Sequence, residues 1–283
     1  MSLLNVNKRL INFRSKDNFL TCSPKIMGIV NLSPESFHTS CEPDEKAIIE
    51  YVWSIIEQGA DIIDIGACST KPNHDYIDSE TEWARLAAAL PIIRKNFPNA
   101  IISLDTFRAD IADKAVRQFG IDIINDISGG TLDGDMFGIA GQLGTPYILT
   151  HYATKEIATE SDEDFLALVI DYFQKRIYSL KQCGVKDIIL DPGFGFGKSL
   201  QQNYCLLRHL SDLDIFGLPI LVGVSNKSMI YKALQCNSQQ ALSGSLAAEM
   251  FALEQGASIL RVHDIAQTAD MIKIFNYIHQ ITL

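Results

Sequence analysis

The sequence lacks the signatures of several protein classes. Its six cysteines form no C-x-x-C pair and no spacing typical of a zinc site. The start, MSLLNVNKRLINF, holds no apolar stretch of the kind found in a secretory signal peptide. No later run reaches the roughly 18 apolar residues of a membrane span. We therefore expect a cytoplasmic protein with reduced cysteines.

Basic residues are also scarce. The chain has 24 Lys and Arg against 34 Asp and Glu, which gives a net charge of -10. Nucleic acids and anionic membranes are bound by broad basic surfaces. The charge therefore argues against a nucleic acid or a membrane as a partner, and any bound anion must meet a local cluster of basic side chains.

A nucleotide-binding loop is absent as well. The stretch DPGFGFGKS at 191–199 is rich in glycine, but a P-loop would need glycine where Pro192 stands. The spacing of Gly193, Gly195 and Gly197 does not match the dinucleotide pattern G-x-G-x-x-G either. We expect these glycines to turn the backbone sharply beside a ligand, where a Cβ would crowd it.

What the sequence does contain is a repeated pattern of an amphipathic stretch, a glycine and a short apolar run. The glycines are Gly59, Gly120, Gly144, Gly184 and Gly256. Glycine takes the left-handed conformation that ends many helices, so each one predicts a helix end. The apolar runs that follow are typical of parallel strands covered on both faces.

Three further apolar runs, KIMGIVNL, AIISLD and PILVGVS, complete a set of eight predicted strands. We expect the strands to end at Asn31, Asp64, Asp105, Asp126, Thr150, Asp191, Ser225 and Val262. Eight strand-helix units in one α/β chain of 283 residues indicate a closed (β/α)8 TIM barrel, with an open doubly wound sheet as the alternative. Residues 1–24 are predicted to form a short N-terminal hairpin extension, and residues 25–283 the single barrel domain.

Polar residues gather at the carboxyl ends of these strands, which all open on one face of such a barrel. They are Asn31, Asp64, Asp105, Asn125, Asp126, His151, Asp191, Lys227, Arg261 and His263. We expect them to converge on one pocket. Other interpretations remain for single residues: Asp264 is expected to cap the last helix, His151 could be a core histidine, and Asp64 a structural hydrogen-bonding group.

The residue types in this set indicate a ligand. Carboxylates accept adjacent N–H donors, and a lysine donates to a ring carbonyl, so a flat heterocycle fits Asp105, Asn125, Asp191 and Lys227. Arg261 and His263 alternate along the last strand, and a guanidinium there suits a phosphate or diphosphate. The sequence thus predicts an amino-substituted heterocycle that carries a phosphate group.

At these residues the chain resembles the dihydropteroate synthase family of pterin-binding barrels. The resemblance runs from about residue 25 to the C-terminus, through IMGIVNLSPESF, DIIDIGACSTKP, ISLDT, DIINDISGG, ILDPGFGFGKS, ILVGVSNKSMI, SGSLAA and LRVHD. It implies a (β/α)8 barrel transferase of folate biosynthesis and a target of sulfonamides. The implied reaction joins 6-hydroxymethyl-7,8-dihydropterin diphosphate to p-aminobenzoate and releases diphosphate. The family also commonly forms a homodimer through helices late in the barrel, which the apolar SLAAEMFALEQ would allow.

The resemblance also implies roles for individual residues. The pterin would be held by Asp105, Asn125, Asp191 and Lys227, and the diphosphate by Asn31, Arg261 and His263 together with Mg²⁺, with Asn31 as the metal ligand. The p-aminobenzoate would be bordered by Thr70, Pro72, Phe196 and Ser228. The catalytic residues would be Asp105, Lys227, Arg261 and His263. On this basis, replacing Arg261 is expected to weaken the diphosphate and to spare the free pterin.

Three places depart from the usual family pattern. The first loop reads His38-Thr39-Ser40-Cys41 without paired glycines, the second carries Cys68 and Lys71, and Asn226 stands where an arginine is usual. Two alternative functions remain, of which the altered loops motivate the first. One is a pterin-binding paralogue with little or no synthase activity. The other is a pterin-barrel methyltransferase domain, against which Arg261 and His263 argue, because that reaction has no diphosphate to hold.

Overall fold

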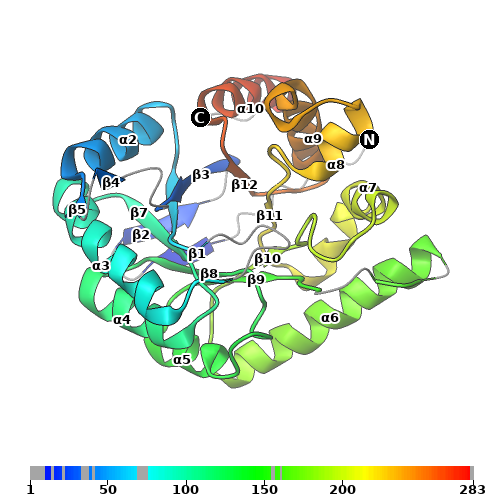
Figure 1. Ribbon diagram of the computed structural model, residues 1–283. Helices are drawn as coiled ribbons and strands as arrows, with labels where there is room; N and C mark the ends of the chain where they lie inside the picture. The colour runs from blue at the N-terminus through cyan, green and yellow to red at the C-terminus, as the bar shows by residue number, and fades with distance from the viewer. Residues whose placement is uncertain are drawn as a thin grey trace.

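Eight parallel strands form a closed barrel (Figure 1). The computed structural model describes residues 10–13, 16–20, 23–32, 38–39, 42–68, 76–153, 157–159 and 161–280. The strands are β3 (Lys25–Asn31), β6 (Ile62–Gly66), β7 (Ile101–Asp105), β8 (Ile123–Asp126), β9 (Tyr147–Thr150), β10 (Ile188–Asp191), β11 (Leu221–Val222) and β12 (Ile259–Val262). Their order is β10-β9-β8-β7-β6-β3-β12-β11, and a parallel bridge between Leu190 and Ile220 joins the two ends. The predicted barrel is confirmed, and the open sheet was the wrong alternative.

Helices alternate with the strands and surround the barrel (Figure 1). They are α2 (Glu45–Glu57), α3 (Ser79–Asn96), α4 (Ala109–Phe119), α5 (Met136–Leu143), α6 (Asp162–Gln182), α7 (Leu200–Arg208), α8 (Ser228–Leu234), α9 (Leu242–Glu254) and α10 (Ile265–His279). Two 3-10 helices, η1 (Leu210–Phe216) and η2 (Ser238–Gln240), lie between them. No helix among the described residues is long and apolar enough to cross a membrane.

The glycines that the sequence assigns to helix ends all have a positive φ, between 61° at Gly144 and 106° at Gly59. These five predicted helix ends are confirmed. Most predicted strand ends are confirmed too, with two differences. Strand β6 continues past Asp64 to Gly66, and β11 ends at Val222, before the expected Ser225.

Two small antiparallel pairs lie outside the barrel sheet. Strand β1 (Leu10–Phe13) pairs with β2 (Lys16–Leu20), and β4 (His38–Thr39) pairs with β5 (Glu42–Pro43). The first pair falls in the segment that the sequence assigns to a hairpin. The domain boundary at residue 24 stays a prediction.

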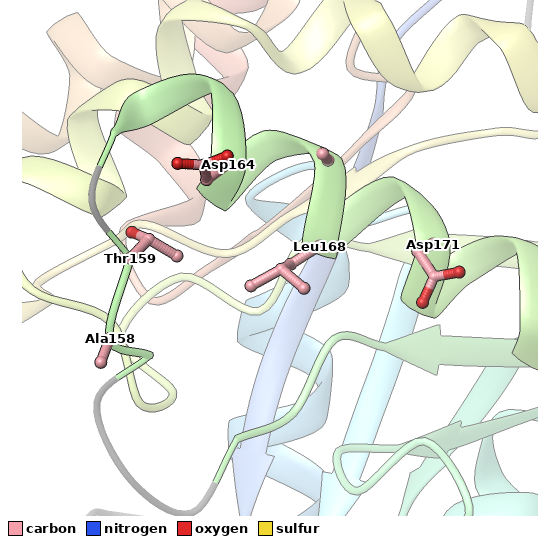
Figure 2. A pocket seen from close by; sticks show the side chains of 6 residues that line it. Ala158, Thr159, Asp164, Leu168 and Asp171 are labelled. Atoms are coloured by element: carbon pink, nitrogen blue, oxygen red, sulfur yellow. The ribbon is translucent and has the colours of Figure 1, made fainter.

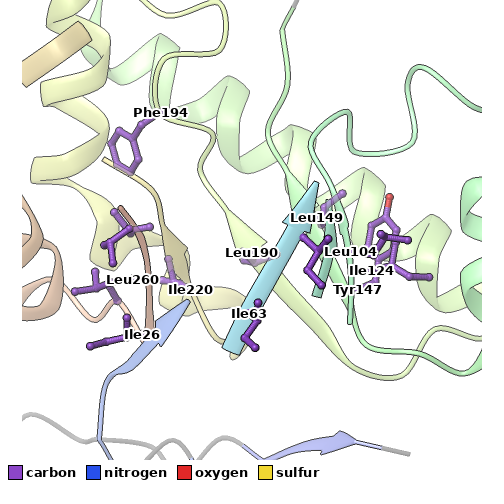
Figure 3. Close-up of a cluster of buried hydrophobic side chains, with 14 of the residues drawn as sticks. Ile26, Ile63, Leu104, Ile124, Tyr147, Leu149, Leu190, Phe194, Ile220 and Leu260 are labelled. Carbon is purple, nitrogen blue, oxygen red and sulfur yellow. The ribbon is translucent and has the colours of Figure 1, made fainter. Parts of the chain in front are cut away.

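The outward-facing strand residues form the main core between strands and helices (Figure 3). Ile63, Leu104, Ile124, Leu149 and Leu190 all belong to this core and are almost fully buried. Side chains alternate between the two faces of a strand, so the residues between these point into the barrel.

The inward-facing residues form two layers of opposite character. The lower layer is a separate apolar cluster with one residue from each strand: Met27, Ile62, Ile101, Ile123, Ile148, Ile189, Leu221 and Ile259. Two residues further along each strand, nearer its carboxyl end, the inward positions are mostly polar. Among them are Asp64, Ser103, Asn125, Thr150, Asp191 and Arg261. The barrel therefore has an apolar floor and a polar upper layer.

Candidate active site

Hydrogen bonds connect Arg261 on β12 directly to β6 and β7 and, through Asp64, to β8. Its Nε donates to Asp64 Oδ2 at 2.7 Å, and its Nη2 donates to Asp105 Oδ2 at 2.8 Å. Asp64 also accepts a hydrogen bond from Asn125 Nδ2 at 3.1 Å. Because Asp64 is completely buried, it serves as the structural hydrogen-bonding group that the sequence left open. It joins one predicted pterin residue, Asn125, to one predicted diphosphate residue, Arg261.

The charged groups of this network shift each other's pKa values. Burial raises the pKa of Asp105 to about 7, against the lowering effect of the Arg261 guanidinium. Burial alone would lower the pKa of Arg261, but Asp64 and Asp105 together raise it. Asp105 Oδ1 is buried and has no hydrogen-bond partner among the described residues. This oxygen can accept an N–H from a ligand at the barrel mouth.

Asp191 and Lys227 form the second part of the site. Asp191 Oδ1 accepts a hydrogen bond from the Gly193 amide at 2.8 Å, and Lys227 Nζ donates to the Phe194 carbonyl at 2.6 Å. Burial raises the pKa of Asp191, while the nearby Lys227 lowers it. Burial lowers the pKa of Lys227 to about 8, against the raising effect of Asp191. A carboxylate and an ammonium thus lie close enough to influence each other without a direct ion pair.

The remaining predicted residues lie on the same side of the barrel where the structure describes them. Asn31 is the exposed last residue of β3, and His263 follows β12, with its amide donating to Ser225 Oγ at 3.3 Å. Phe196 lies near Lys227, whose Nζ is 5.2 Å from the ring centroid, and Ser228 is the first residue of α8. Thr70 and Pro72, and with them Lys71 of the second loop, lie outside the described residues.

Two of the polar strand-end residues point away from the barrel interior. For Asp126 the predicted convergence was wrong, whereas for His151 the alternative of a core histidine is confirmed. Asp126 points to the outer side of the barrel, where it accepts hydrogen bonds from the Tyr147 hydroxyl and from the amides of Ser128 and Gly130. His151 is buried, with its ring centroid 4.6 Å from that of Tyr172 on α6. The reason is the two-residue period of a strand, which turns the neighbour of an inward residue outward.

Asp264 occupies the N-cap position of α10, but its side chain makes no capping hydrogen bond. It instead accepts a hydrogen bond from Asn226 Nδ2 at 3.0 Å. Asn226 has a φ of 56°, a left-handed conformation that asparagine tolerates better than most residues. The expected side-chain cap was therefore wrong, and Asn226 instead links the segment after β11 to the start of α10.

Comparison with known proteins agrees with this geometry. A sequence profile described as "Pterin binding enzyme" matches residues 27–263. The chain belongs to the pterin-binding enzyme family. It is 39% identical over 265 residues to a dihydropteroate synthase of Neisseria meningitidis serogroup B, covering 89% of this chain and 92% of that one. The resemblance seen in the sequence is confirmed.

Solved structures of the family are similar over most of this chain. A Coxiella burnetii dihydropteroate synthase in complex with pteroic acid is 34% identical, with a TM-score of 0.85 over 96% of this chain and 99% of that one. A Xanthomonas albilineans dihydropteroate synthase with 4-aminobenzoic acid is 30% identical, with a TM-score of 0.84 over 94% and 96% of the two chains.

Sequence reasoning missed two features of this pterin-binding enzyme. Glu82 on α3 is completely buried, accepts a hydrogen bond from Thr106 Oγ1 at 2.7 Å and pairs with Arg108. Lys198, in the glycine-rich stretch, donates to three backbone carbonyls. The signal for Lys198 was present, since this cation directly follows three closely spaced glycines and has no acidic residue within six positions, which favours backbone carbonyls as its acceptors. Glu82 gave no such signal, because it resembles any exposed glutamate of a first helical turn.

A separate surface hollow of about 490 Å³ lies beside the start of α6 (Figure 2). Its lining includes Asp164, Leu168 and Asp171, with Ala158 and Thr159 opposite. It contains none of the predicted site residues. The two carboxylates would repel a diphosphate, so this hollow is not the site of the family's reaction.

Proposed function

We propose that the protein is a dihydropteroate synthase, a transferase that condenses 6-hydroxymethyl-7,8-dihydropterin diphosphate with p-aminobenzoate. The observation that carries the proposal is the polar layer at the carboxyl end of the barrel. There two carboxylates and an amide lie beside Lys227 and Arg261, above an apolar floor. Relatives with this fold have been solved with pteroic acid and with 4-aminobenzoic acid.

The pterin is held by the residues that offer complementary hydrogen bonds to its edge. Asp105 keeps a buried oxygen without a partner among the described residues, which suits an N–H of the heterocycle. Asp191 accepts N–H donors from the other side, and Lys227 donates to a ring carbonyl. Asn125 also forms hydrogen bonds with the edge of the pterin, and its own hydrogen bond to Asp64 holds it in position.

The diphosphate is held by Arg261 and His263 at the end of β12. A guanidinium has five N–H donors, and two of those in Arg261 contact Asp64 and Asp105. Within the part of the chain that the structure describes, the other three donate no hydrogen bond, so they can donate to phosphate oxygens, and His263 lies two residues nearer the barrel mouth. Arg261 therefore contacts both the leaving group and a pterin-binding carboxylate.

Mg²⁺ fits this site as a partner of the diphosphate. Among the described residues no three His, Cys, Asp or Glu side chains cluster as metal ligands. Mg²⁺ usually keeps several waters and binds through few protein ligands plus phosphate oxygens, and the exposed Asn31 supplies one amide oxygen. When bound, the ion would neutralise charge on the leaving diphosphate.

The chemistry needs little from a protein base. The bond from the pterin methylene to the diphosphate oxygen breaks, and its electron pair leaves with the diphosphate. The arylamine nitrogen then bonds to the methylene and afterwards loses one proton. Asp105 and Asp191 stabilise the positive charge that develops on the pterin side, and Arg261 and His263 stabilise the negative charge on the leaving group. Phe196 and Ser228, with Thr70 and Pro72, border the p-aminobenzoate.

A direct assay tests the function. The protein is incubated with dihydropterin diphosphate, p-aminobenzoate and Mg²⁺, and dihydropteroate is measured, with and without a sulfonamide as competitor of p-aminobenzoate. Product formation supports the proposal. Pterin binding without product would favour the paralogue, and methyl transfer from a methylated folate would favour the methyltransferase domain.

We also propose a homodimer and a cytoplasmic location. A groove of about 410 Å³ between α7, α8 and α9 is lined mostly by apolar residues, with Arg208 as its one charged residue among those described, and its Leu234 is 50% and its Phe251 42% exposed. A second copy would cover this groove.

The free cysteines support the cytoplasmic location. Cys183, Cys205 and Cys236 carry free thiols, as a reducing compartment would keep them. Cell fractionation tests the location.

The dimer is tested by the mass of the particle in solution. Light scattering should give the mass of two chains for the wild type and of one chain for Phe251→Glu, because a carboxylate cannot be buried in an apolar interface without a partner. Ile274→Glu on α10, at a residue 56% exposed but away from the groove, is the matched control and should remain a dimer. A wild-type monomer would contradict the proposal.

A further inference from the structure

Lys198 is surrounded by backbone carbonyls. Its Nζ donates to the carbonyl of Gly193 at 2.8 Å, of Phe196 at 3.1 Å and of His151 at 3.2 Å. An ammonium group has three N–H donors, so three carbonyls match its capacity. Two of these carbonyls belong to the loop between β10 and α7, and the third follows β9. Lys198 therefore fastens that loop to the neighbouring strand.

The fastened loop carries parts of the candidate site. The Gly193 amide donates to Asp191, and the Phe194 carbonyl accepts from Lys227. The Phe196 ring lies against the same Lys227 ammonium. Each contact joins the loop to a residue of the proposed pterin or p-aminobenzoate site, so the position of the loop sets the positions of those side chains.

The loop has little freedom to compensate for a loss of Lys198. Gly193 has a φ of 68°, and a Cβ there would stand 2.2 Å from the His151 carbonyl oxygen, so the two backbones are in close contact. Without the ammonium, three carbonyls that point at one place would repel each other. Burial lowers the pKa of Lys198 to about 7 and Lys227 adds to this, whereas Asp191 raises it, and the three carbonyl acceptors favour the charged form.

We infer that Lys198 is a positioning residue for the pterin and arylamine substrates: it acts as a built-in cation that orders the loop presenting Asp191, Lys227 and Phe196. The inference rests on the proposed function. It assigns no contact between Lys198 and a substrate. It predicts that the charge of the lysine, and not only its volume, sets the affinity for pterin.

The first test compares Lys198→Met with the wild type. Methionine has a similar length but no N–H donor, so the affinity for dihydropterin diphosphate should fall about 10- to 100-fold, the range for lost hydrogen bonds to a charged group. The KM for p-aminobenzoate should rise as well, because Phe196 moves with the loop. Inhibition by inorganic diphosphate, which depends on Arg261 and His263, should stay within about twofold. Lys175→Met, at an exposed lysine on α6, is the matched control and should match the wild type in all three.

The second test is chemical rescue. In Lys198→Ala the missing ammonium leaves a space beside the three carbonyls, and added ethylammonium should restore pterin affinity at least severalfold. Ethanol, of similar size but without charge, should not. If Lys198→Met does not fold, Lys198→Arg serves instead: its planar guanidinium cannot meet three carbonyls from one nitrogen, so pterin affinity should still fall.

The outcomes separate this inference from the proposed function. Unchanged pterin affinity in Lys198→Met or Lys198→Arg overturns the inference and leaves the function intact. Equal losses for pterin and inorganic diphosphate also overturn it, since they indicate general destabilisation. Equal rescue by ethanol does the same. A wild-type protein that binds no pterin overturns the proposed function first, and the inference with it.

Discussion

The two layers inside the barrel differ in chemistry although the same strands build both. The lower layer places one apolar side chain from each strand in a closed cluster. The upper layer, two residues further along, holds the carboxylates of Asp64 and Asp191 together with Arg261, which donates a hydrogen bond to Asp64. On β10 the apolar Ile189 and the acidic Asp191 are only two residues apart and point to the same side of the strand. The apolar layer can only stabilise the barrel. The polar layer costs stability, because it buries charged groups, and we propose that its role is to bind the substrates.

This difference gives each layer its own signature in experiments. Substitutions in the lower layer should change the free energy of unfolding and leave ligand affinity alone. Substitutions in the upper layer should change affinity, and should change stability only where they leave a buried charge without its partner.

Arg261→Ala should have the largest effect. It leaves Asp64 and Asp105 buried without their guanidinium, and breaking a buried pair in this way costs about 3–5 kcal/mol of unfolding free energy. Because Arg261 contacts Asp105, affinity for both free pterin and diphosphate should fall. This revises the expectation from the sequence that free pterin would be spared.

Urea unfolding and titration calorimetry with each ligand measure the two effects of Arg261→Ala. Arg261→Lys is the informative comparison, since it keeps the charge but cannot bridge both carboxylates as the guanidinium does. A loss confined to diphosphate would show that the contact with Asp105 has no role in pterin binding.

Asp191→Asn should affect binding more than stability. The asparagine oxygen can still accept from the Gly193 amide, so the fold should be kept. Pterin affinity should fall by about 2–5 kcal/mol, as for the truncation of a buried charged partner. Fluorescence titration with a pterin measures this, and Asp171→Asn on the surface of α6 is the control. If Asp191→Asn bound pterin with the affinity of the wild type, Asp191 would not be part of the pterin site.

Ile189→Ala should give the opposite result two residues away on the same strand. Loss of a completely buried isoleucine costs about 2–5 kcal/mol of unfolding free energy, because the removed methyl groups leave a cavity in a closed cluster. Pterin affinity of the remaining folded protein should be unchanged, as measured at a temperature where the variant is fully folded. A loss of affinity comparable to that of Asp191→Asn would mean that the two layers are not independent.

The sequence predicted the barrel well because local signals determine it. Helix-ending glycines such as Gly120 and Gly144 need a positive φ wherever they lie, and apolar runs show buried strands directly. The sequence also predicted which strand ends carry polar residues. It could not predict with certainty which of two adjacent polar residues faces inward, so Asn125 and Asp126 were placed together although they point to opposite faces.

The contacts that organise the site could not be predicted, because they join residues distant in the chain. The bond from Arg261 to Asp64 spans 197 positions, and that from Lys198 to the His151 carbonyl spans 47. Neither follows from spacing or periodicity. The sequence identified the residue types of the site, but their mutual support depends on the register of strands and the path of the β10–α7 loop.

The smallest predicted effect is on the pH dependence of stability and concerns His151, which lies on the outer side of the barrel at the end of β9. Burial lowers its pKa to about 3, whereas the ordinary value is 6.5. Above pH 6.5 the ring is neutral in both the folded and the unfolded chain, and no stability is lost. As the pH falls below 6.5, only the unfolded chain takes up the proton, so stability decreases until the pH reaches about 3. At pH 5.5 the loss should be about 1 kcal/mol.

His151→Phe keeps an aromatic ring against Tyr172 but cannot titrate, so its unfolding free energy should fall less than that of the wild type between pH 7.5 and 5.5. Urea unfolding at the two pH values measures the difference, while pterin affinity at pH 7.5 should be the same in both proteins. Parallel losses of stability would contradict a buried neutral His151, and a loss of pterin affinity would place the residue in the pocket after all.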